Sequence, residues 1–190
     1  MRVAGARRFS KCLFFPKVFD FKPGFQNSVI LGLGGNIGDV KKRFRRLHFK
    51  LSRDSRFHVV ENSALLINEA FGFKEQADFT NAVMLAQTSL AARQILKITA
   101  NLEKRFGRVR SFKNAPRTLD IDILYFSGRN RNDVRLTLPH PGAQSRASVI
   151  LPLGTMKNTS LTTAVSTKKN STASSLFCNR HSMSNCLTRR

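Results

Sequence analysis

Two aspartates interrupt an apolar segment in the second half of the chain. The segment from Ala115 to Phe126 reads APRTLDIDILYF and places Asp120 and Asp122 among Leu, Ile and Tyr side chains. Residues two apart on a β-strand lie on the same face. If the segment is a strand, both carboxylates point to one side, and their mutual repulsion requires nearby cations or a metal ion.

Basic residues precede these aspartates closely along the chain, at Arg108, Arg110, Lys113 and Arg117. One interpretation is a structural cluster of ion pairs in a very basic protein. The other is a centre for phosphate transfer, in which carboxylates hold Mg²⁺ and arginines hold phosphate oxygens. The residue types alone leave both interpretations open.

A second motif, GLGGNIGD, has glycines at positions 32, 34, 35 and 38. This spacing does not match the dinucleotide fingerprint G-x-G-x-x-G, and Asp39 stands where a P-loop has lysine. The motif therefore predicts the end of a strand, where glycines let a ligand or another backbone come close. Further along, LPHPGAQSR places His140 and Arg146 on either side of a turn.

The elements that must position these residues follow from hydrophobic patterning. Apolar or β-branched runs predict strands at residues 28–34, 57–68 with a break near Asn62, 81–88, and 115–126. The last of these strands begins near Pro116, because proline cannot donate to the interior of a ladder.

Two helices are predicted between these strands. Apolar residues at helical spacing predict one helix over residues 40–51 with Asp39 as its N-cap, and a second that begins at an N-cap Ser89 and closes at Gly107. The order strand, helix, strand, strand, helix, strand is typical of an α/β (α+β) fold, the ferredoxin-like βαββαβ sandwich. We therefore expect an antiparallel sheet with the helices on one face.

The chain of 190 residues, with 41% hydrophobic residues, suits one domain with extensions. We divide it into a basic N-terminal extension (1–27), a domain (28–153) and a Ser/Thr/Lys-rich tail (154–190) that we expect to be disordered. Three phenylalanines of the extension, Phe14, Phe15 and Phe19, favour packing against the domain. A mitochondrial presequence is the alternative, since such segments are basic and free of acidic residues.

Charge and cysteine usage narrow the class of protein. There are 33 Lys and Arg against 11 Asp and Glu, a net charge of +22, which favours an anionic partner such as nucleic acid, acidic lipid or a polyphosphate. Three cysteines without CxxC spacing predict neither a disulfide framework nor a zinc site, and favour a reducing compartment. No apolar run approaches the length of a membrane span. These features predict a soluble, cytoplasmic protein with no membrane partner.

Taken in order, the motifs resemble the 6-hydroxymethyl-7,8-dihydropterin pyrophosphokinase (diphosphokinase) family of folate biosynthesis. The resemblance rests on LGLGGNIGD, EQADFTNAV, LEKRFGRVR, APRTLDIDILYF, LTLPHPGAQSR and VILPL, and spans about residues 28–153. PRTLDIDIL with its downstream PHP is the most specific part. The resemblance implies a small monomeric enzyme that transfers a diphosphate group from ATP to the pterin hydroxymethyl oxygen and releases AMP.

The resemblance also implies a role for each matching residue. Asp120 and Asp122 would ligate two Mg²⁺ ions, with ATP as the co-substrate, and Phe79 and Asn81 would contact the pterin. The remaining implied residues are basic or acidic groups around the ATP: Arg108, Arg110 and Arg117 as catalytic groups, and Glu103, Arg135, His140 and Arg146 as nucleotide-binding groups.

Two departures from the family pattern concern the walls of the site. The loop from Ser111 to Ala115 is shorter by about a residue and lacks the family's Trp, for which Phe112 is the candidate replacement. Ser148 stands where the family often has an aromatic residue.

A basic ferredoxin-like nucleic-acid-binding module is the rival hypothesis, because aromatic residues on such a sheet can stack bases and the charge suits a phosphate backbone. The sequence lacks the K/R-G-F/Y-G/A-F-V-x-F/Y signature of those modules. The aspartates at the centre of the proposed site would also repel a nucleic-acid backbone. We therefore favour the enzyme and expect no specific nucleic-acid partner.

Overall fold

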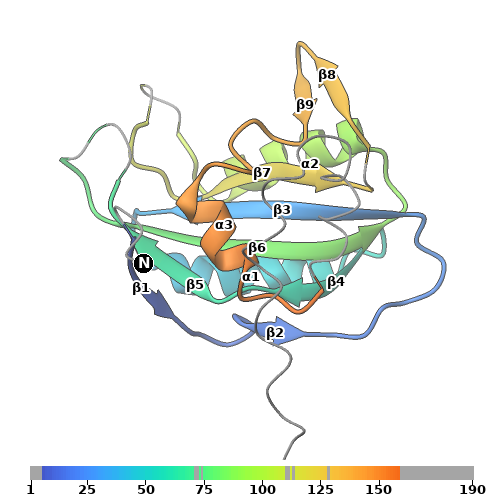
Figure 1. Ribbon diagram of the computed structural model, residues 1–190, viewed down its shortest axis with the longest axis horizontal. Helices are drawn as coiled ribbons and strands as arrows, with labels where there is room; N and C mark the ends of the chain where they lie inside the picture. The colour runs from blue at the N-terminus through green and yellow to red at the C-terminus, as the bar shows by residue number, and fades with distance from the viewer. Residues whose placement is uncertain are drawn as a thin grey trace, which may run out of the picture.

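The computed structural model describes residues 6–70, 73, 75–109, 112, 114–127 and 129–158. Within these residues the chain forms a mixed α/β fold with a seven-stranded sheet, a separate two-stranded hairpin and three helices (Figure 1). Every strand pairing in this part of the chain is antiparallel. The prediction of an antiparallel sheet in a mixed fold is confirmed.

Strands β3 (Asn27–Gly35) and β6 (Phe79–Thr88) form the centre of the sheet. β7 (Asp120–Phe126) pairs with the other edge of β3, while β4 (Phe57–Asn62) and β5 (Leu65–Asn68) share the other edge of β6. The predicted strands are therefore present, and the break near Asn62 separates β4 from β5.

β7 begins later than the sequence predicts, at Asp120 rather than near Pro116. In the segment before β7, Asn36 hydrogen-bonds to the backbone of Arg117 in place of a paired strand. Its backbone N–H donates to the carbonyl of Arg117 at 3.0 Å, and its side-chain Oδ1 accepts the N–H of Arg117 at 2.8 Å. A side chain thus satisfies the backbone where the ladder has not begun.

The N-terminal extension lies on the sheet edge. Strand β1 (Ala6–Ser10) pairs with β5, and β2 (Lys17–Val18) pairs with β4. Phe15 is fully buried in the main core, and Phe14 and Phe19 pack against that core. The predicted packing of these three phenylalanines is confirmed, although the two edge strands were not predicted.

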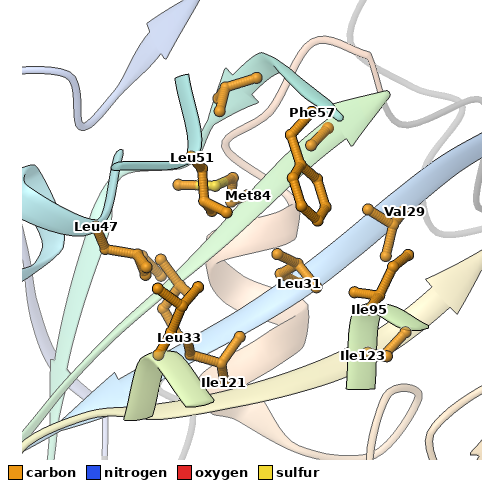
Figure 2. Packing of buried hydrophobic residues seen from close by; sticks show 14 of the residues in the cluster. Val29, Leu31, Leu33, Leu47, Leu51, Phe57, Met84, Ile95, Ile121 and Ile123 are labelled. Atoms are coloured by element: carbon orange, nitrogen blue, oxygen red, sulfur yellow. The ribbon is translucent and has the colours of Figure 1, made fainter. Parts of the chain in front are cut away.

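Helices α1 (Val40–Ser52) and α2 (Ala92–Arg105) cover one face of the sheet. Figure 2 shows the residues that fill this core, and those labelled on the sheet and the two helices include Val29, Leu31, Leu33, Leu47, Leu51, Met84, Ile95, Ile121 and Ile123. Asp39 is the N-cap of α1 as predicted, because its Oδ1 accepts the N–H of Lys42 at 2.8 Å.

The predicted start of α2 is wrong, and its predicted end is confirmed. The N-cap is Ala91 rather than Ser89, and the side chain of Gln94 accepts the N–H of Ala91 at 2.8 Å. The hydroxyl of Thr88 accepts the N–H of Leu90, so the residues around Ser89 form a turn after β6 instead of opening the helix. Gly107 follows the last turn with a φ of 79°, the left-handed conformation that glycine adopts without strain.

The two predicted helices lie on one face as expected, but a third helix that the sequence did not predict covers the other face. Helix α3 (Ala147–Leu153) lies in front of the sheet in Figure 1, with α1 and α2 behind. It contributes to a second core, made of Ile30, Val60, Val83, Leu85, Leu124, Tyr125, Ala143, Val149 and Met156.

Residues beyond the predicted domain end at Leu153 also contact the sheet. Met156 is buried, and the hydroxyl of Thr155 accepts the N–H of Ala64 at 3.0 Å. The carboxylate of Glu61 accepts the N–H groups of Lys157 and Asn158 at 2.6 and 2.9 Å. The rest of the predicted tail, residues 159–190, lies outside the described residues, as do residues 1–5 of the extension.

The remaining strands, β8 (Arg131–Asp133) and β9 (Leu136–Leu138), form a hairpin that projects from the sheet near α2 (Figure 1). In the part of the chain that the structure describes, no helix is long and apolar enough to cross a membrane.

Candidate active site

Asp120 and Asp122 lie on one face of β7, as the period of two predicts. Ile121 and Ile123, which alternate with them, belong to the core beneath α1 and α2. The two carboxylates therefore point to the opposite face of the sheet, the face on which α3 lies. Each is partly buried.

The central strands bring two polar residues and one glycine on this face into one row. Gly34 of β3 is in register with Asn81 of β6 on one side and with Asp120 of β7 on the other. Neighbouring strands lie about 4.8 Å apart, so the backbones of Asn81 and Asp120 are separated by about 10 Å. Between them Gly34 presents no side chain.

Gly34 is required for this gap. A Cβ atom at that position would lie 3.0 Å from Oδ1 of Asn81 and 3.7 Å from Cβ of Asp120. Any larger residue would push the Asn81 amide aside. The glycine-rich motif therefore supplies close approach on this face, which the sequence predicted without indicating which group comes close.

Asp120 is held between two arginines. Nη1 of Arg108 lies 2.6 Å from Oδ1, and Nη1 of Arg117 lies 2.5 Å from Oδ2. Arg108 also pairs with Glu103 of α2, whose carboxylate accepts the N–H of Ile121 at 2.7 Å. Burial raises the pKa of Glu103 above its ordinary value, and the hydrogen bonds from Ile121 and Arg108 offset part of that rise.

Asp122 has a different electrostatic environment from Asp120. Burial raises the pKa of Asp122, and the negative charge of Asp120 raises it further. The nearby basic side chains of His140, Arg146 and Arg108 act in the opposite direction and lower the pKa of Asp122 in part.

The segment after β9 positions His140 and Arg146. The backbone N–H of His140 donates to the carbonyl of Leu124 at 2.9 Å, and its Nδ1 accepts the N–H of Gly142 at 3.0 Å. The neutral ring therefore carries its proton on Nε2. A Cβ atom on Gly142 would lie 2.5 Å from Nε of Arg146, so the arginine side chain rests on this glycine.

Two loops flank this row. One follows β5 and the other precedes β7, and they lie side by side in Figure 1. The side chain of Gln76 donates to the carbonyl of Asn114 at 3.0 Å and ties one loop to the other. Phe73 and Phe112 meet edge to face at a centroid distance of 5.5 Å. Phe112 is 57% exposed, so its ring is available as the aromatic wall for which the sequence nominated it.

Phe79 lies at the same end of the sheet, at the start of β6. The guanidinium of Arg117 is 5.4 Å from the centre of its ring. This distance permits a cation–π contact. Arg117 therefore touches both the predicted metal ligand Asp120 and the predicted pterin contact Phe79.

One predicted residue, Arg135, does not lie with the residues around Asp120 and Asp122. Arg135 is exposed at the turn of the β8–β9 hairpin, where its N–H donates to Asp133 at 3.0 Å, and among the described residues no contact joins it to the aspartates. Arg110 lies outside the described residues. Ser148 is partly buried in the first turn of α3.

The donor set around the aspartates fits a hard divalent cation bound together with substrate. In the described part of the chain, no group of three or more His, Cys, Asp or Glu side chains could hold a metal ion by itself. Mg²⁺ is usually bound by one or two carboxylates, with water and substrate phosphates completing its octahedron. Asp120 and Asp122, on one face and two residues apart, match that requirement.

Three residues of the cluster were not predicted from the sequence. They are Asn36, Gln76 and Asn68, which hydrogen-bond to the loops or to Asn81. Asparagine and glutamine between a strand and a loop are common, so their type carries no signal without a tertiary neighbour.

Residues 30–158 match the family model described as 7,8-dihydro-6-hydroxymethylpterin-pyrophosphokinase (HPPK). A 2-amino-4-hydroxy-6-hydroxymethyldihydropteridine pyrophosphokinase of Campylobacter jejuni is 51% identical over 154 residues, covering 81% of this chain and 98% of the relative. Proteins with the same name from Helicobacter pylori and Bacillus subtilis are 39% identical over 142 residues and 33% identical over 127 residues. These alignments cover 74% and 67% of this chain, and 87% and 76% of the relatives.

Proposed function

The chain belongs to the 7,8-dihydro-6-hydroxymethylpterin-pyrophosphokinase family, and from this premise we propose that it catalyses diphosphate transfer in folate biosynthesis. The hydroxymethyl oxygen of 6-hydroxymethyl-7,8-dihydropterin forms a bond to the β-phosphorus of ATP. The bond between that phosphorus and the oxygen bridging it to the α-phosphate breaks, the hydroxyl proton is lost, and AMP leaves. The relatives are pyrophosphokinases, so the nucleic-acid-binding hypothesis receives no support from them.

The observation that carries the proposal is the row formed by Asn81, Gly34 and Asp120. An amide that can recognise a pterin edge lies at one end, and a carboxylate that can hold a metal lies at the other. The bare glycine between them leaves room for a flat ligand. One substrate group can therefore be recognised at Asn81 while the reacting end lies toward Asp120.

The phosphate-binding role falls on the basic residues around the aspartates. Arg108 and Arg117 already converge on Asp120, where they can reach the oxygens of a diphosphate bound next to it. His140 and Arg146 lie near Asp122 and are proposed to contact the nucleotide, as is Glu103 through its pair with Arg108. We also propose Arg110 as a catalytic group and Arg135 as a nucleotide-binding group, on the family resemblance alone.

Asp120 and Asp122 would hold the two Mg²⁺ ions. When bound, the ions neutralise the charge on the transferred phosphates and orient them for displacement. The side chains of the protein bind and orient the substrates. Phe79 and Phe112 offer aromatic surface for the pterin, and Asn81 recognises its amide edge.

The fold supports the same proposal at a coarser level. The strands that carry the site are ordered β4 and β5, then β6, β3 and β7, with α1 following β3 and α2 following β6. We propose that this core is ferredoxin-like, with β1, β2, α3 and the β8–β9 hairpin added to it. The monomeric state and the cytoplasmic location remain predictions, and we propose Asn158 rather than Leu153 as the end of the domain.

The direct test is incubation of the purified chain with ATP, Mg²⁺ and 6-hydroxymethyl-7,8-dihydropterin, with nucleotide products separated by chromatography. AMP should form in equal amount to the pterin diphosphate, and only when pterin is present. Formation of ADP instead would indicate ordinary kinase chemistry. Release of AMP without pterin would indicate hydrolysis, and either result would overturn the reaction proposed.

A further inference from the structure

The side-chain amide of Asn68, at the end of β5, connects the backbone of the neighbouring loop to Asn81. Its Nδ2 donates to the carbonyl of Glu69 at 2.7 Å, and its Oδ1 accepts from Nδ2 of Asn81 at 2.6 Å. Asn81 is a residue to which a substrate contact is assigned above, whereas Asn68 has been given no role.

This chain of hydrogen bonds has only one consistent direction. A backbone carbonyl can accept a hydrogen bond but cannot donate one. The amide of Asn68 must therefore turn its NH₂ group to Glu69 and its oxygen to Asn81. That oxygen can only accept, so Asn81 must turn its own NH₂ group toward Asn68.

The direction of the chain determines what Asn81 presents to a ligand. With Nδ2 turned to Asn68, Oδ1 of Asn81 lies on the side of Gly34, where it is the nearest atom, at 3.0 Å, to the position of an added Cβ. A free asparagine amide can present either end, because the two orientations have nearly the same shape. Here the open side of the row is given a hydrogen-bond acceptor.

We propose that Asn68 is a positioning residue that holds the carbonyl oxygen of Asn81 toward the substrate over Gly34. The proposal rests on the pterin diphosphokinase function given above. The ligand group that meets Asn81 must then be an N–H donor, which the pyrimidine ring of a pterin offers on its ring nitrogen and its amino group. The side chain of Asn68 would act on the substrate through the orientation of Asn81.

The backbone around Asn68 is held from both sides, which makes it a firm support. Asn68 is in register with Phe79 of β6 on one edge and with Ala6 of β1 on the other. A site residue positioned by a partner on a paired strand keeps its orientation before the ligand arrives. The N-terminal extension thus reinforces the strand that orients Asn81.

The test is replacement of Asn68 by alanine in the full chain, with binding measured by calorimetry. We expect the Kd for 6-hydroxymethyl-7,8-dihydropterin, measured with a non-hydrolysable ATP analogue present, to rise about tenfold, the loss expected for one hydrogen bond and a fixed orientation. The Kd for the ATP analogue and the kcat at saturating pterin should stay within about twofold of wild type. Asn101→Ala, an exposed asparagine on α2, is the matched control and should change none of these quantities.

A double-mutant cycle separates positioning from a merely structural role. If Asn68 acts through Asn81, adding Asn68→Ala to Asn81→Ala should weaken pterin binding no further. Asn68→Asp keeps an oxygen that can accept from Asn81 but loses the bond to the Glu69 carbonyl, so it should recover part of the affinity lost in Asn68→Ala. Equal losses in the Asp and Ala variants, or additive losses in the cycle, would overturn the proposal.

Failure of the proposed role of Asn68 can be distinguished from failure of the proposed diphosphokinase function. If the wild-type chain forms no AMP and binds no pterin, the proposed function fails. If the wild type is active and Asn68→Ala binds pterin normally, only the role of Asn68 is lost. Thermal melting of each variant identifies loss of folding, and the Asn68→Asp variant then decides the question.

Discussion

Arg117 and Asp120 are joined by a contact of 2.5 Å between Nη1 and Oδ2. The other carboxylate oxygen of Asp120 faces Arg108, so the charge of Asp120 is countered on both sides. Asp122 lies on the same strand face, but burial and the charge of Asp120 raise its pKa. Two aspartates that look equivalent in the sequence therefore differ in electrostatic environment.

Both aspartates should nevertheless be essential for turnover. Asp120→Asn or Asp122→Asn keeps the size of the side chain and removes a charge that would hold Mg²⁺, so we expect kcat to fall by about 100-fold or more. AMP formation at saturating ATP, Mg²⁺ and pterin measures the effect. Asp20→Asn, at an exposed position of the N-terminal extension, is the control. Normal turnover in both site variants would mean that the pair is a structural ion cluster.

The same two variants should differ in stability. A carboxylate whose pKa is raised in the folded state destabilises the fold above its unfolded pKa, and stability falls as the pH rises through the folded value. Asp122→Asn should therefore raise the free energy of unfolding at pH 7 without Mg²⁺. Asp120→Asn should give no such gain, because it removes the partner of Arg108 and Arg117. Urea denaturation of the three proteins at pH 7 checks the order, and a stabilised Asp120→Asn would contradict it.

Gly34→Ala should weaken pterin binding selectively. The added methyl would lie 3.0 Å from Oδ1 of Asn81 and displace that amide. We expect the Kd for pterin to rise about tenfold or more, with the affinity for an ATP analogue little changed. Gly154→Ala, where an added Cβ makes only ordinary contacts at 3.5 Å, is the matched control. Unchanged pterin affinity in Gly34→Ala would show that the ligand does not use this gap.

Truncation should locate the end of the domain. If the tail were disordered from residue 154, as its composition predicts, a chain ending near Leu153 would fold as well as the whole protein. The structure leads to another expectation, because Glu61 is only 2% exposed and accepts the N–H groups of Lys157 and Asn158. A chain ending at Asn158 should melt like the full chain. One ending at Leu153 should lose about 3 kcal/mol or more, since it leaves a buried carboxylate unpaired.

The matched variant for this truncation is Glu61→Gln in the full chain. It retains one acceptor oxygen and removes the charge, so its loss of stability should be smaller than that of the chain ending at Leu153. Equal unfolding free energies for the two truncated chains would show that residues 154–158 contribute nothing to the fold.

His48 should make the folded state sensitive to acid. Its ring is 4% exposed and stacks on Phe14 at 4.4 Å, and burial lowers its pKa from 6.5 to about 4. Between these values the unfolded chain binds a proton that the folded chain does not. Stability therefore falls as the pH drops, by up to about 1.4 kcal/mol per pH unit. His48→Gln removes the titrating group. The difference between the two unfolding free energies should be constant above pH 6.5 and change with pH below it, as the wild type loses stability that His48→Gln keeps. Parallel profiles at all pH values would contradict the assignment.

Local patterns in the sequence determined the features that depend on a few neighbouring residues. The alternation of DIDI places Asp120 and Asp122 on one face, because the strand period is two wherever the strand lies. Asp39 caps α1 and Gly107 closes α2 because each acts on backbone groups within one turn. Ser89 failed as a cap because Thr88 already accepts the N–H that follows, and competing turns of this kind have the same composition as a cap.

Tertiary structure decided the features that join distant parts of the chain. The register of three strands sets Asn81, Gly34 and Asp120 in one row, although Gly34 lies 47 positions before Asn81 (81 − 34) and 86 positions before Asp120 (120 − 34). The orientation of the Asn81 amide depends on Asn68 and on the backbone beyond it. Sequence determined which groups could do the chemistry, since residue type and local period carry that information. Which of them meet, and which end of the Asn81 amide faces Gly34, depends on pairing between strands that no local pattern encodes.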